Sequence, residues 1–424
     1  MDLEESHPGL AAQLRFVAAE SPYYRSRGAD PRDLATFPVL TKAMVRGGTR
    51  EMLTSRTEAE RNALAAELLR TDLSAERNRA GEFRFGADVV IDQTTGTSGI
   101  PARFPKTGAE RTELALATFM RRRGFDPELR PAEFVPLLHH RWDQSFDFDI
   151  WSRSVDDLRR MYAWLAGKRA RWIHMPAVLI ARHAAALEEA GIADPVPSLK
   201  FIESTGSRLT PEAVAAARRV FHAGTVNQYG TIEMWVIGYA AGTGPFAIND
   251  AAVHVELVDD DERPIDAPGI EGDVVVTSLV LRLLPLVRYR TGDRGAWVDE
   301  PGAGGGPARR LALAEERDVN KLTIDGRRIS GTEAFRPILR RVYARVGYAG
   351  VEAVQITQVG PETIRLSLNR SPQAGDICRA FHEECLKLRA GIAVEFDLRE
   401  ADDRSFLDRK GNLFVNRWGS PGKP

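Results

Sequence analysis

A run of hydroxyl-bearing and glycine residues follows a strand-like segment, Asp88–Asp92, in the first quarter of the chain. The residues of this run that could do chemistry are Thr94, Thr95, Gly96, Thr97, Ser98 and Gly99. Glycine lets a backbone turn tightly and point its N–H groups at an anion, and neighbouring hydroxyls add hydrogen-bond donors. The run predicts a phosphate cradle or, alternatively, a polar surface turn. It is not a Walker loop, because the lysine of that pattern is missing.

Two acidic residues stand at predicted turns. Glu233 closes the segment Tyr229–Glu233, which lies where a strand should end. A carboxylate beside a phosphate loop suits Mg²⁺, a hard cation that prefers oxygen ligands. Asp293 closes the segment Tyr289–Asp293, where a carboxylate at a turn could bind a ribose diol. The alternatives are an ordinary strand-end turn for Glu233 and an Asp-capped turn for Asp293.

A charged segment, Glu316–Ser330, comes soon after the most loop-like part of the chain, Pro301–Pro307. Its place at the start of the final block is that of a hinge. The alternative is an inter-domain linker followed by a charged hairpin.

The elements that must position these residues change in kind along the chain. Strand-like runs alternate with helical periodicity between residues 88 and 212, which argues for an α/β sheet architecture. In residues 252–298 the hydrophobic period changes to strand-like alternation interrupted by turns, which predicts a β-rich subdomain. The final block mixes helices and strands. The predicted fold class is therefore α/β. A large N-terminal domain, residues 1–316, combines α/β sheets with the β-rich subdomain, and a small α+β C-terminal domain follows over residues 317–424.

Composition excludes several classes of protein. The 424 residues include 58 Lys+Arg and 59 Asp+Glu, a net charge of −1 that lacks the footprint of a general nucleic-acid binder. The two cysteines, Cys378 and Cys385, are too few for a disulfide scaffold and are predicted to be core residues. The first residues are acidic with no apolar run behind them, and no stretch of about 18 apolar residues occurs. We expect a soluble, cytoplasmic protein with no nucleic-acid and no membrane partner.

The order and spacing of these segments resemble the adenylate-forming superfamily of acyl-CoA synthetases, adenylation domains and luciferases over nearly the whole chain. The resemblance is closest to the phenylacetate–CoA ligase branch, which has a Pro-x-Leu-Thr-Lys element matched here by Pro38–Lys42. The phosphate loop of that branch is similar to Thr94–Pro101, and its Tyr-Arg-Thr-Gly-Asp motif is intact at Tyr289–Asp293. Arg317 and Gly326 keep the spacing of the family's hinge motif.

The resemblance implies a two-step AMP-forming acid ligase. A carboxylate attacks the α-phosphate of MgATP to give an acyl-adenylate and pyrophosphate. The small C-terminal domain, mobile in this superfamily, then rotates, and a nucleophile, commonly the thiol of CoA, takes the acyl group. ATP, Mg²⁺ and CoA are therefore implied, together with a small, aromatic carboxylic acid as substrate and a homodimer as the assembly. Backbone donors, Mg²⁺ and cationic side chains would stabilise the charge on the phosphate oxygens.

The same resemblance implies roles for individual residues. Thr94–Gly99 would hold the triphosphate, Glu233 the Mg²⁺ and Asp293 the ribose hydroxyls. Tyr229 would stack on the base. The implied catalytic residues are Lys410, Glu233 and Arg317. The other implied nucleotide-binding residues lie in the adenine segment, the Tyr-Gly motif and the hinge segment: Ser204, Thr205, Gly206, Gly230, Thr231 and Lys321.

The sequence departs from the family pattern at three places. Ile232 replaces a hydroxyl that usually touches phosphate, and Val319 stands where the hinge usually has a carboxylate. The family's late lysine normally follows a glycine, whereas here Lys410 precedes Gly411 and Asn412 stands in the expected place. Either Lys410 reaches the site from a shifted loop, or the adenylation lysine is absent.

The acid pocket is predicted near His139 and His140. Neighbouring residues on a strand face opposite ways, so at most one of the two would gate the site or contact the substrate carboxylate. The alternative is a surface histidine beside a packed one, and Trp235 is either a pocket wall or a core residue. Arg121–Arg123 is predicted to be a solvated helix end or a contact for a CoA phosphate. The acyl acceptor could also be an amine, another nitrogen nucleophile or a carrier protein, and a non-catalytic adenylate-binding relative is a third possibility.

Overall fold

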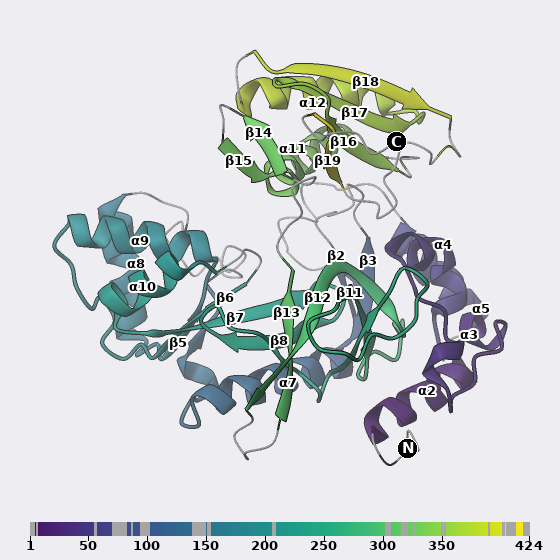
Figure 1. Cartoon of the computed structure of the whole chain (residues 1–424), viewed down its shortest axis with the longest axis horizontal. Helices are drawn as coiled ribbons and strands as arrows, with labels where there is room; N and C mark the ends of the chain where they lie inside the picture. The colour runs from purple at the N-terminus through teal and green to yellow at the C-terminus, as the bar shows by residue number, and fades with distance from the viewer. Residues whose placement is uncertain are drawn as a thin grey trace. The chain divides into compact units, whose positions relative to one another are not determined.

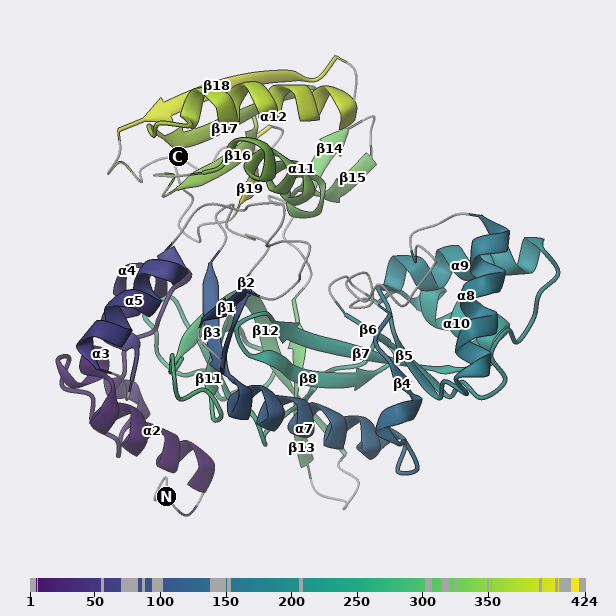
Figure 2. The same ribbon diagram turned by 180° about the vertical axis from the view of Figure 1, so that it is seen from behind.

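In the computed structural model, the chain forms two compact units. The helices and strands are labelled in Figures 1 and 2. The first unit comprises Met1–Thr41 and Thr107–Leu313, and the second comprises Lys42–Lys106 and Ala314–Pro424. No helix among the described residues is long and apolar enough to cross a membrane. The structure describes residues 5, 7–54, 57–69, 83–85, 88–93, 102–137, 150, 154–205, 209–301, 307–314, 321–324, 327–348, 351, 353–388, 391–400, 403 and 413–418.

A mixed sheet of six described strands forms the centre of the first unit. The strands β4 to β7 are parallel, and β8 and β9 continue the sheet in antiparallel fashion. In spatial order, which is also chain order, they are β4 (Phe134–Val135), β5 (Trp172–His174), β6 (Phe201–Ser204), β7 (Gly224–Thr231), β8 (Trp235–Ala241) and β9 (Ala247–Ile248).

Helices cover both faces of this sheet (Figure 2). Successive strand residues point to opposite faces, so Ile173 and Ile202 pack in one core with α8, α9 and α10. Trp172 and Phe201 point the other way, into a second core with the aromatic residues of α7. The bounds of these helices are α7 (Gly108–Phe125), α8 (Val155–Gly167), α9 (Ala177–Glu189) and α10 (Pro211–Phe221).

Local sequence sets the ends of two of these helices. Thr107 caps α7 in a capping box, because its hydroxyl accepts from the Glu110 N–H while the Glu110 carboxylate accepts from the Thr107 N–H. Thr210 caps α10, and Pro211 stands at the first helical position. His222 ends α10 in a left-handed conformation.

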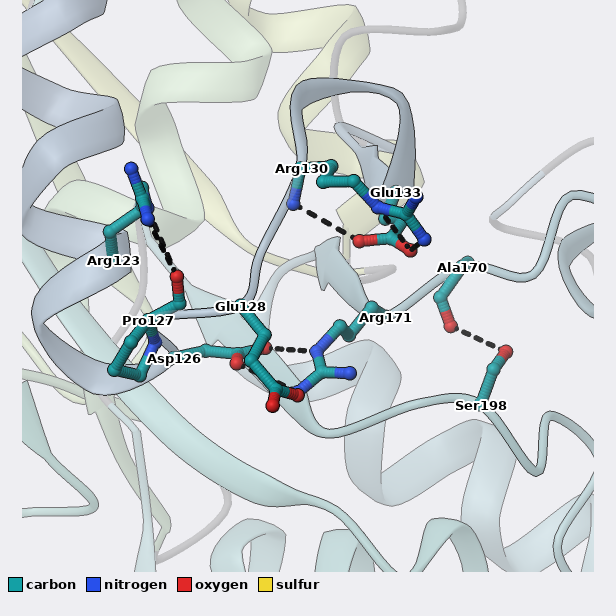
Figure 3. A network of polar contacts seen from close by, with 9 residues as sticks. All are labelled: Arg123, Asp126, Pro127, Glu128, Arg130, Glu133, Ala170, Arg171 and Ser198. Carbon is teal, nitrogen blue, oxygen red and sulfur yellow. Dashed lines mark hydrogen bonds and ion pairs between the residues drawn. The ribbon is translucent and has the colours of Figure 1, made fainter.

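An ion-pair network fixes the amino-terminal edge of the parallel strands (Figure 3). The Arg171 guanidinium binds the Asp126 carboxylate at 2.5 and 2.9 Å and the Glu128 carboxylate at 2.7 Å. The Arg171 N–H also donates to the Glu133 carbonyl oxygen. This network anchors the start of β5 to the segment that leaves α7, at the opposite end of the strand from the predicted site.

A second, antiparallel sheet of four described strands completes the first unit, in the order β10-β11-β12-β13. Its bounds are β10 (Val253–Val258), β11 (Glu271–Ser278), β12 (Tyr289–Pro301) and β13 (Pro307–Leu313). The helices described before residue 40 are α2 (Pro8–Glu20), α3 (Pro22–Arg25) and the 3₁₀ helix η1 (Leu34–Thr36). The Gln13 side chain donates to the Leu281 carbonyl, which ties α2 to the segment after β11.

The second unit combines helices with three small sheets. Its main sheet has the order β18-β17-β16-β19, and its core joins this sheet to α11 and α12 through apolar residues that include Cys378 and Cys385. Both cysteines are buried and free, as predicted. The elements are α4 (Lys42–Met52), α5 (Glu58–Leu69), β1 (Phe83–Phe85), β2 (Val89–Gln93), β3 (Arg103–Thr107), β14 (Lys321–Ile324), β15 (Arg327–Ser330), α11 (Gly331–Val346), β16 (Val354–Gln358), β17 (Thr363–Asn369), α12 (Ala374–Leu388), β18 (Ala393–Arg399) and β19 (Phe414–Asn416).

Candidate active site

The structure describes only part of the predicted site. The residues in the first unit are Ser204, Thr205, Tyr229, Gly230, Thr231, Glu233, Trp235 and Asp293, and Lys321 belongs to the second unit. The other predicted site residues lie outside the described residues: Thr94, Thr95, Gly96, Thr97, Ser98, Gly99, His139, His140, Gly206, Arg317 and Lys410.

Two parallel strands bring the predicted adenine segment and the Tyr-Gly motif to one edge of the central sheet. Ser204 is the last residue of β6 and pairs in register with Asn227 of β7. The Thr205 hydroxyl donates to the Gln228 carbonyl oxygen at 3.4 Å. The Ser204 hydroxyl is buried and has no hydrogen-bond partner among the described residues. Open α/β sheets bind ligands beyond the carboxyl ends of their strands, so this edge is a suitable place for a ligand.

A tight turn between β7 and β8 presents Glu233. Gly230 lies at an irregularity in the pairing of β7 with β8, and a Cβ at Gly230 would lie 1.9 Å from the Trp235 carbonyl oxygen. The Thr231 hydroxyl accepts from the Met234 N–H at 3.2 Å, and Trp235 adopts a positive φ of 63°. Only glycine allows the two strands to approach so closely, and the turn that follows directs the Glu233 side chain into the protein.

A bulge in β12 presents Asp293. Arg290 pairs with Val275 and Arg294 with Asp273, so Thr291-Gly292-Asp293 stands out from the ladder. Gly292 has φ 91°, a conformation that L side chains rarely adopt. The Thr291 hydroxyl donates to the Val274 carbonyl and accepts from the Asp293 N–H. Bulges re-aim side chains, and this one leaves Asp293 exposed.

Two tyrosine hydroxyls bring these motifs together. The Tyr229 hydroxyl donates to Asp293 Oδ2 at 2.8 Å and lies 3.2 Å from Thr291 Oγ1. The Tyr289 hydroxyl donates to Glu233 Oε1 at 2.7 Å. Burial, together with the charge of the facing carboxylate, raises the pKa of each tyrosine well above its usual range. Both phenols are therefore neutral donors near neutral pH.

The Pro-x-Leu-Thr-Lys element contacts the strand that bears Asp293. The Leu40 N–H donates to the Arg288 carbonyl at 2.9 Å, and the Arg290 N–H donates to the Leu40 carbonyl at 2.9 Å. The Arg288 guanidinium is buried and binds Glu256 at 3.3 Å and the Phe37 carbonyl at 3.2 Å. Arg288 itself adopts φ 51°. The N-terminal element therefore fixes the backbone on both sides of Tyr289.

The donor set fits a magnesium nucleotide. Mg²⁺ usually takes one or two protein carboxylates and completes its shell with phosphate oxygens and water. The Glu233 carboxylate has about four lone-pair sites, and the Tyr289 hydroxyl uses one of them. The described residues contain no group of three His, Cys, Asp or Glu side chains that could hold a metal ion by itself. A single carboxylate such as that of Glu233 is the type of protein ligand that Mg²⁺ takes.

A buried ion pair lies beside the predicted adenine segment, and it was not predicted. Arg122 Nε and Nη2 donate to the Glu203 carboxylate at 2.6 and 3.0 Å, and the Trp172 indole N–H donates to it at 2.8 Å. Burial raises the pKa of Glu203, but the charge and hydrogen bonds of Arg122 outweigh burial and lower it overall. The one available signal was an acidic residue inside the apolar strand Phe201–Ser204.

The arginine run in α7 is only partly the solvated helix end that the sequence predicts. Arg123 is exposed and donates to the Pro127 carbonyl. Arg121 binds Asp250 at 2.6 Å and also donates to the Ile248 carbonyl. The interpretation is wrong for Arg122, whose guanidinium is buried against Glu203 and lies 3.9 Å from the centre of the Phe134 ring. The helical period points this residue at the sheet, and a nearby charge compensates it.

Trp235 and Lys321 are the two remaining predicted site residues that the structure describes. Trp235 is half-buried, and the Arg111 guanidinium lies 5.6 Å from the centre of its ring. Lys321 begins β14, where its carbonyl accepts from the Asn416 amide at 2.9 Å. Its side chain is half-buried.

Comparison with known proteins identifies the fold. No protein-family model matches the sequence, and no curated protein matches it. The structure is similar to that of 2-hydroxyisobutyryl-CoA ligase in the postadenylation state in complex with R3-HIB-AMP, with TM-score 0.55 and 14% identity over 98% of this chain and 90% of that one. The same ligase with 2-HIB-AMP and CoA in the thioesterification state gives TM-score 0.56 and 16% identity at the same coverage.

The chain therefore has the fold of an adenylate-forming CoA ligase over nearly its whole length. The predicted α/β class, with a large N-terminal and a smaller C-terminal domain, is confirmed. The phenylacetate–CoA ligase branch and the domain boundary at residue 316 stay predictions.

Proposed function

We propose that this protein is an ATP-dependent acid–CoA ligase. It activates a small aromatic carboxylic acid as the acyl-adenylate, releases pyrophosphate and passes the acyl group to CoA. The main support is the pair of hydrogen bonds from Tyr229 to Asp293 and from Tyr289 to Glu233, each of which joins the acidic residue of one motif to the tyrosine of the other. The likeness in fold to a CoA ligase crystallised with an acyl-AMP and CoA agrees with this proposal. The preference for an aromatic acid depends on the resemblance to the phenylacetate–CoA ligase branch and on the Trp, Phe and His content of residues 139–151.

Each tyrosine–carboxylate pair lies with the residues that bind a different part of ATP. Asp293 accepts hydrogen bonds from the ribose hydroxyls, and Tyr229 stacks on the adenine. Glu233 holds the Mg²⁺ ion, and Thr94–Gly99 donates to the phosphate oxygens. Mg²⁺, when bound, neutralises part of the charge on those oxygens. Ser204 and Thr205 line the base at the end of β6.

The acyl group moves in two displacements. In the first, a carboxylate oxygen of the acid attacks the α-phosphorus, and the bond from that phosphorus to pyrophosphate breaks. In the second, the CoA sulfur attacks the acyl carbon and AMP leaves. Lys410 and Arg317 supply positive charge beside the reacting oxygens. Residues 317–424 move as a lid between the two steps.

Glu233→Gln is expected to lower carboxylate-dependent ATP–pyrophosphate exchange by about 100-fold, because an uncharged amide is a poor ligand for Mg²⁺. The measurement is isotope exchange with the wild-type chain and the variant across a panel of aromatic and aliphatic acids. Glu189→Gln removes a charge from an exposed position at the end of α9 and should leave exchange unchanged.

The same assay separates the alternatives. Wild-type exchange with aliphatic acids only would overturn the aromatic assignment. Exchange followed by product with amines or a carrier protein, and none with CoA, would overturn the acceptor. If the chain binds ATP but shows no exchange with any acid, it is a non-catalytic adenylate-binding protein.

Lys410→Ala is expected to reduce exchange by about 100-fold while leaving the Kd for ATP nearly unchanged, because the cation acts on charge that develops as the acid attacks. Exchange rates and calorimetric ATP binding test both parts. Lys168→Ala, at the exposed end of α8, is the control. Exchange at the wild-type rate in the Lys410 variant would show that the chain adenylates without this lysine.

A further inference from the structure

The two tyrosine–carboxylate hydrogen bonds cross between the motifs. Tyr229 stands four residues before Glu233, and Tyr289 stands four residues before Asp293. Each hydroxyl nevertheless donates to the acid of the other motif: Tyr229 to Asp293 at 2.8 Å and Tyr289 to Glu233 at 2.7 Å. Two hydrogen bonds therefore join β7 and the turn after it to β12, a strand of the other sheet.

The rings that bear these hydroxyls are largely buried. Tyr289 and Tyr229 are 1% and 7% exposed, and the Tyr229 ring centre lies 5.7 Å from that of Phe246. The backbone around Tyr289 is fixed by the two hydrogen bonds with Leu40. A large displacement of either ring therefore requires repacking of the core.

We propose that Tyr289 and Tyr229 are positioning residues that act at opposite ends of the nucleotide. Tyr289 orients Glu233 toward the metal ion, and Tyr229 orients Asp293 toward the ribose. The proposal rests on the proposed function, since it assigns the two tyrosines to the nucleotide site described there.

The physical reason is preorganisation. A carboxylate on a turn can rotate about its side-chain torsions, and this freedom is lost when it binds a ligand. A hydroxyl that holds one oxygen of the carboxylate removes that freedom beforehand and fixes the direction of the remaining lone pairs. Mutation of a residue that hydrogen-bonds to a metal-binding carboxylate typically lowers metal affinity by about 10- to 100-fold. Removal of either tyrosine hydroxyl should therefore weaken the binding of one end of ATP and leave the binding of the other end unchanged.

The test is ATP binding by calorimetry in the absence of any acid, so that no adenylation occurs. Two ratios are measured: the gain in affinity on adding Mg²⁺, and the preference for ATP over 2′,3′-dideoxy-ATP. Tyr289→Phe should lower the Mg²⁺ gain by about tenfold and keep the ribose preference. Tyr229→Phe, which keeps the ring for stacking, should lower the ribose preference by about tenfold and keep the Mg²⁺ gain.

Tyr239→Phe is the matched control. Tyr239 is a buried tyrosine on β8, and its hydroxyl has no hydrogen-bond partner among the described residues. The Mg²⁺ gain and the ribose preference of the Tyr239→Phe variant should equal those of the wild type.

A purely structural role would lower the Tm of the Tyr289 and Tyr229 variants and leave both ratios at wild-type values, and this result would overturn the proposal. So would equal losses of both ratios in each variant. Wild-type binding of ATP without exchange would overturn the proposed function alone. No binding of ATP by the wild type would overturn both.

Discussion

Glu203→Ala is expected to remove about 3–5 kcal/mol from the free energy of unfolding, because it leaves the charge of Arg122 buried without its partner. The Glu203 side chain is fully buried and that of Arg122 is 9% exposed. The Trp172 indole loses its acceptor in the same variant. Denaturant unfolding followed by circular dichroism measures the change, and an unchanged unfolding midpoint would contradict the expectation.

The chain offers an exposed ion pair as a matched control. Arg219 on α10 binds Glu188 on α9 through both carboxylate oxygens, and the two side chains are 57% and 40% exposed. Exposed pairs typically contribute about 0–1 kcal/mol, so Glu188→Ala should change stability little. The double variant Arg122→Met with Glu203→Leu should recover much of the loss, because burying apolar side chains does not require desolvating two charges.

The buried pair also predicts the direction of a pH effect. The pKa of Glu203 is lower in the folded chain than its ordinary value, because Arg122 outweighs the effect of burial. An acid with a lowered folded pKa contributes stability that is complete above its unfolded pKa, about 4.3, and is lost as the pH falls through the folded value. A fall in pH should therefore lower the free energy of unfolding of the wild type through protonation of Glu203. This part of the pH dependence should be missing from Glu203→Ala.

Features encoded in short segments were predictable from the sequence. The capping residues before α7 and α10 and the glycine-marked turns at Gly230 and Gly292 use local rules, in which a few adjacent residues determine the backbone. The order of the motifs along the chain predicted the fold. Open α/β sheets bind ligands beyond the carboxyl ends of their strands, and this rule predicts that the site lies at the sheet edge near Ser204 and Tyr229.

Contacts between distant segments were not predictable. Tyr229 and Asp293 are 64 residues apart, and Arg122 and Glu203 are 81 apart. Leu40 pairs beside Tyr289, although nothing in the spacing of the two segments relates them. Arg122 was expected at a solvated helix end, and nothing near it in the sequence indicated that an acidic residue on β6 would neutralise it inside the protein. Register and partner choice depend on packing of the whole core, which no single window of sequence contains.

Gly230→Ala is expected to cost about 3 kcal/mol of stability, at the upper end of the range for overpacking. The added Cβ would lie 1.9 Å from the Trp235 carbonyl oxygen and 3.0 Å from its carbon, and both are backbone atoms that cannot rotate away. Relief requires β7 and β8 to separate at their pairing irregularity. That movement displaces Tyr229 on one side of the glycine and Glu233 on the other.

The variant should therefore lose both the Mg²⁺ gain and the ribose preference in ATP binding, unlike either tyrosine variant. Thermal unfolding and calorimetry measure the two effects. Gly167→Ala is the matched control, because a Cβ at the end of α8 meets no atom within 4 Å and alanine favours a helix by about 0.5–1 kcal/mol over glycine. Wild-type Tm and wild-type ratios in Gly230→Ala would show that the turn tolerates a side chain. The close approach of the two strands would then not be what places the carboxylates.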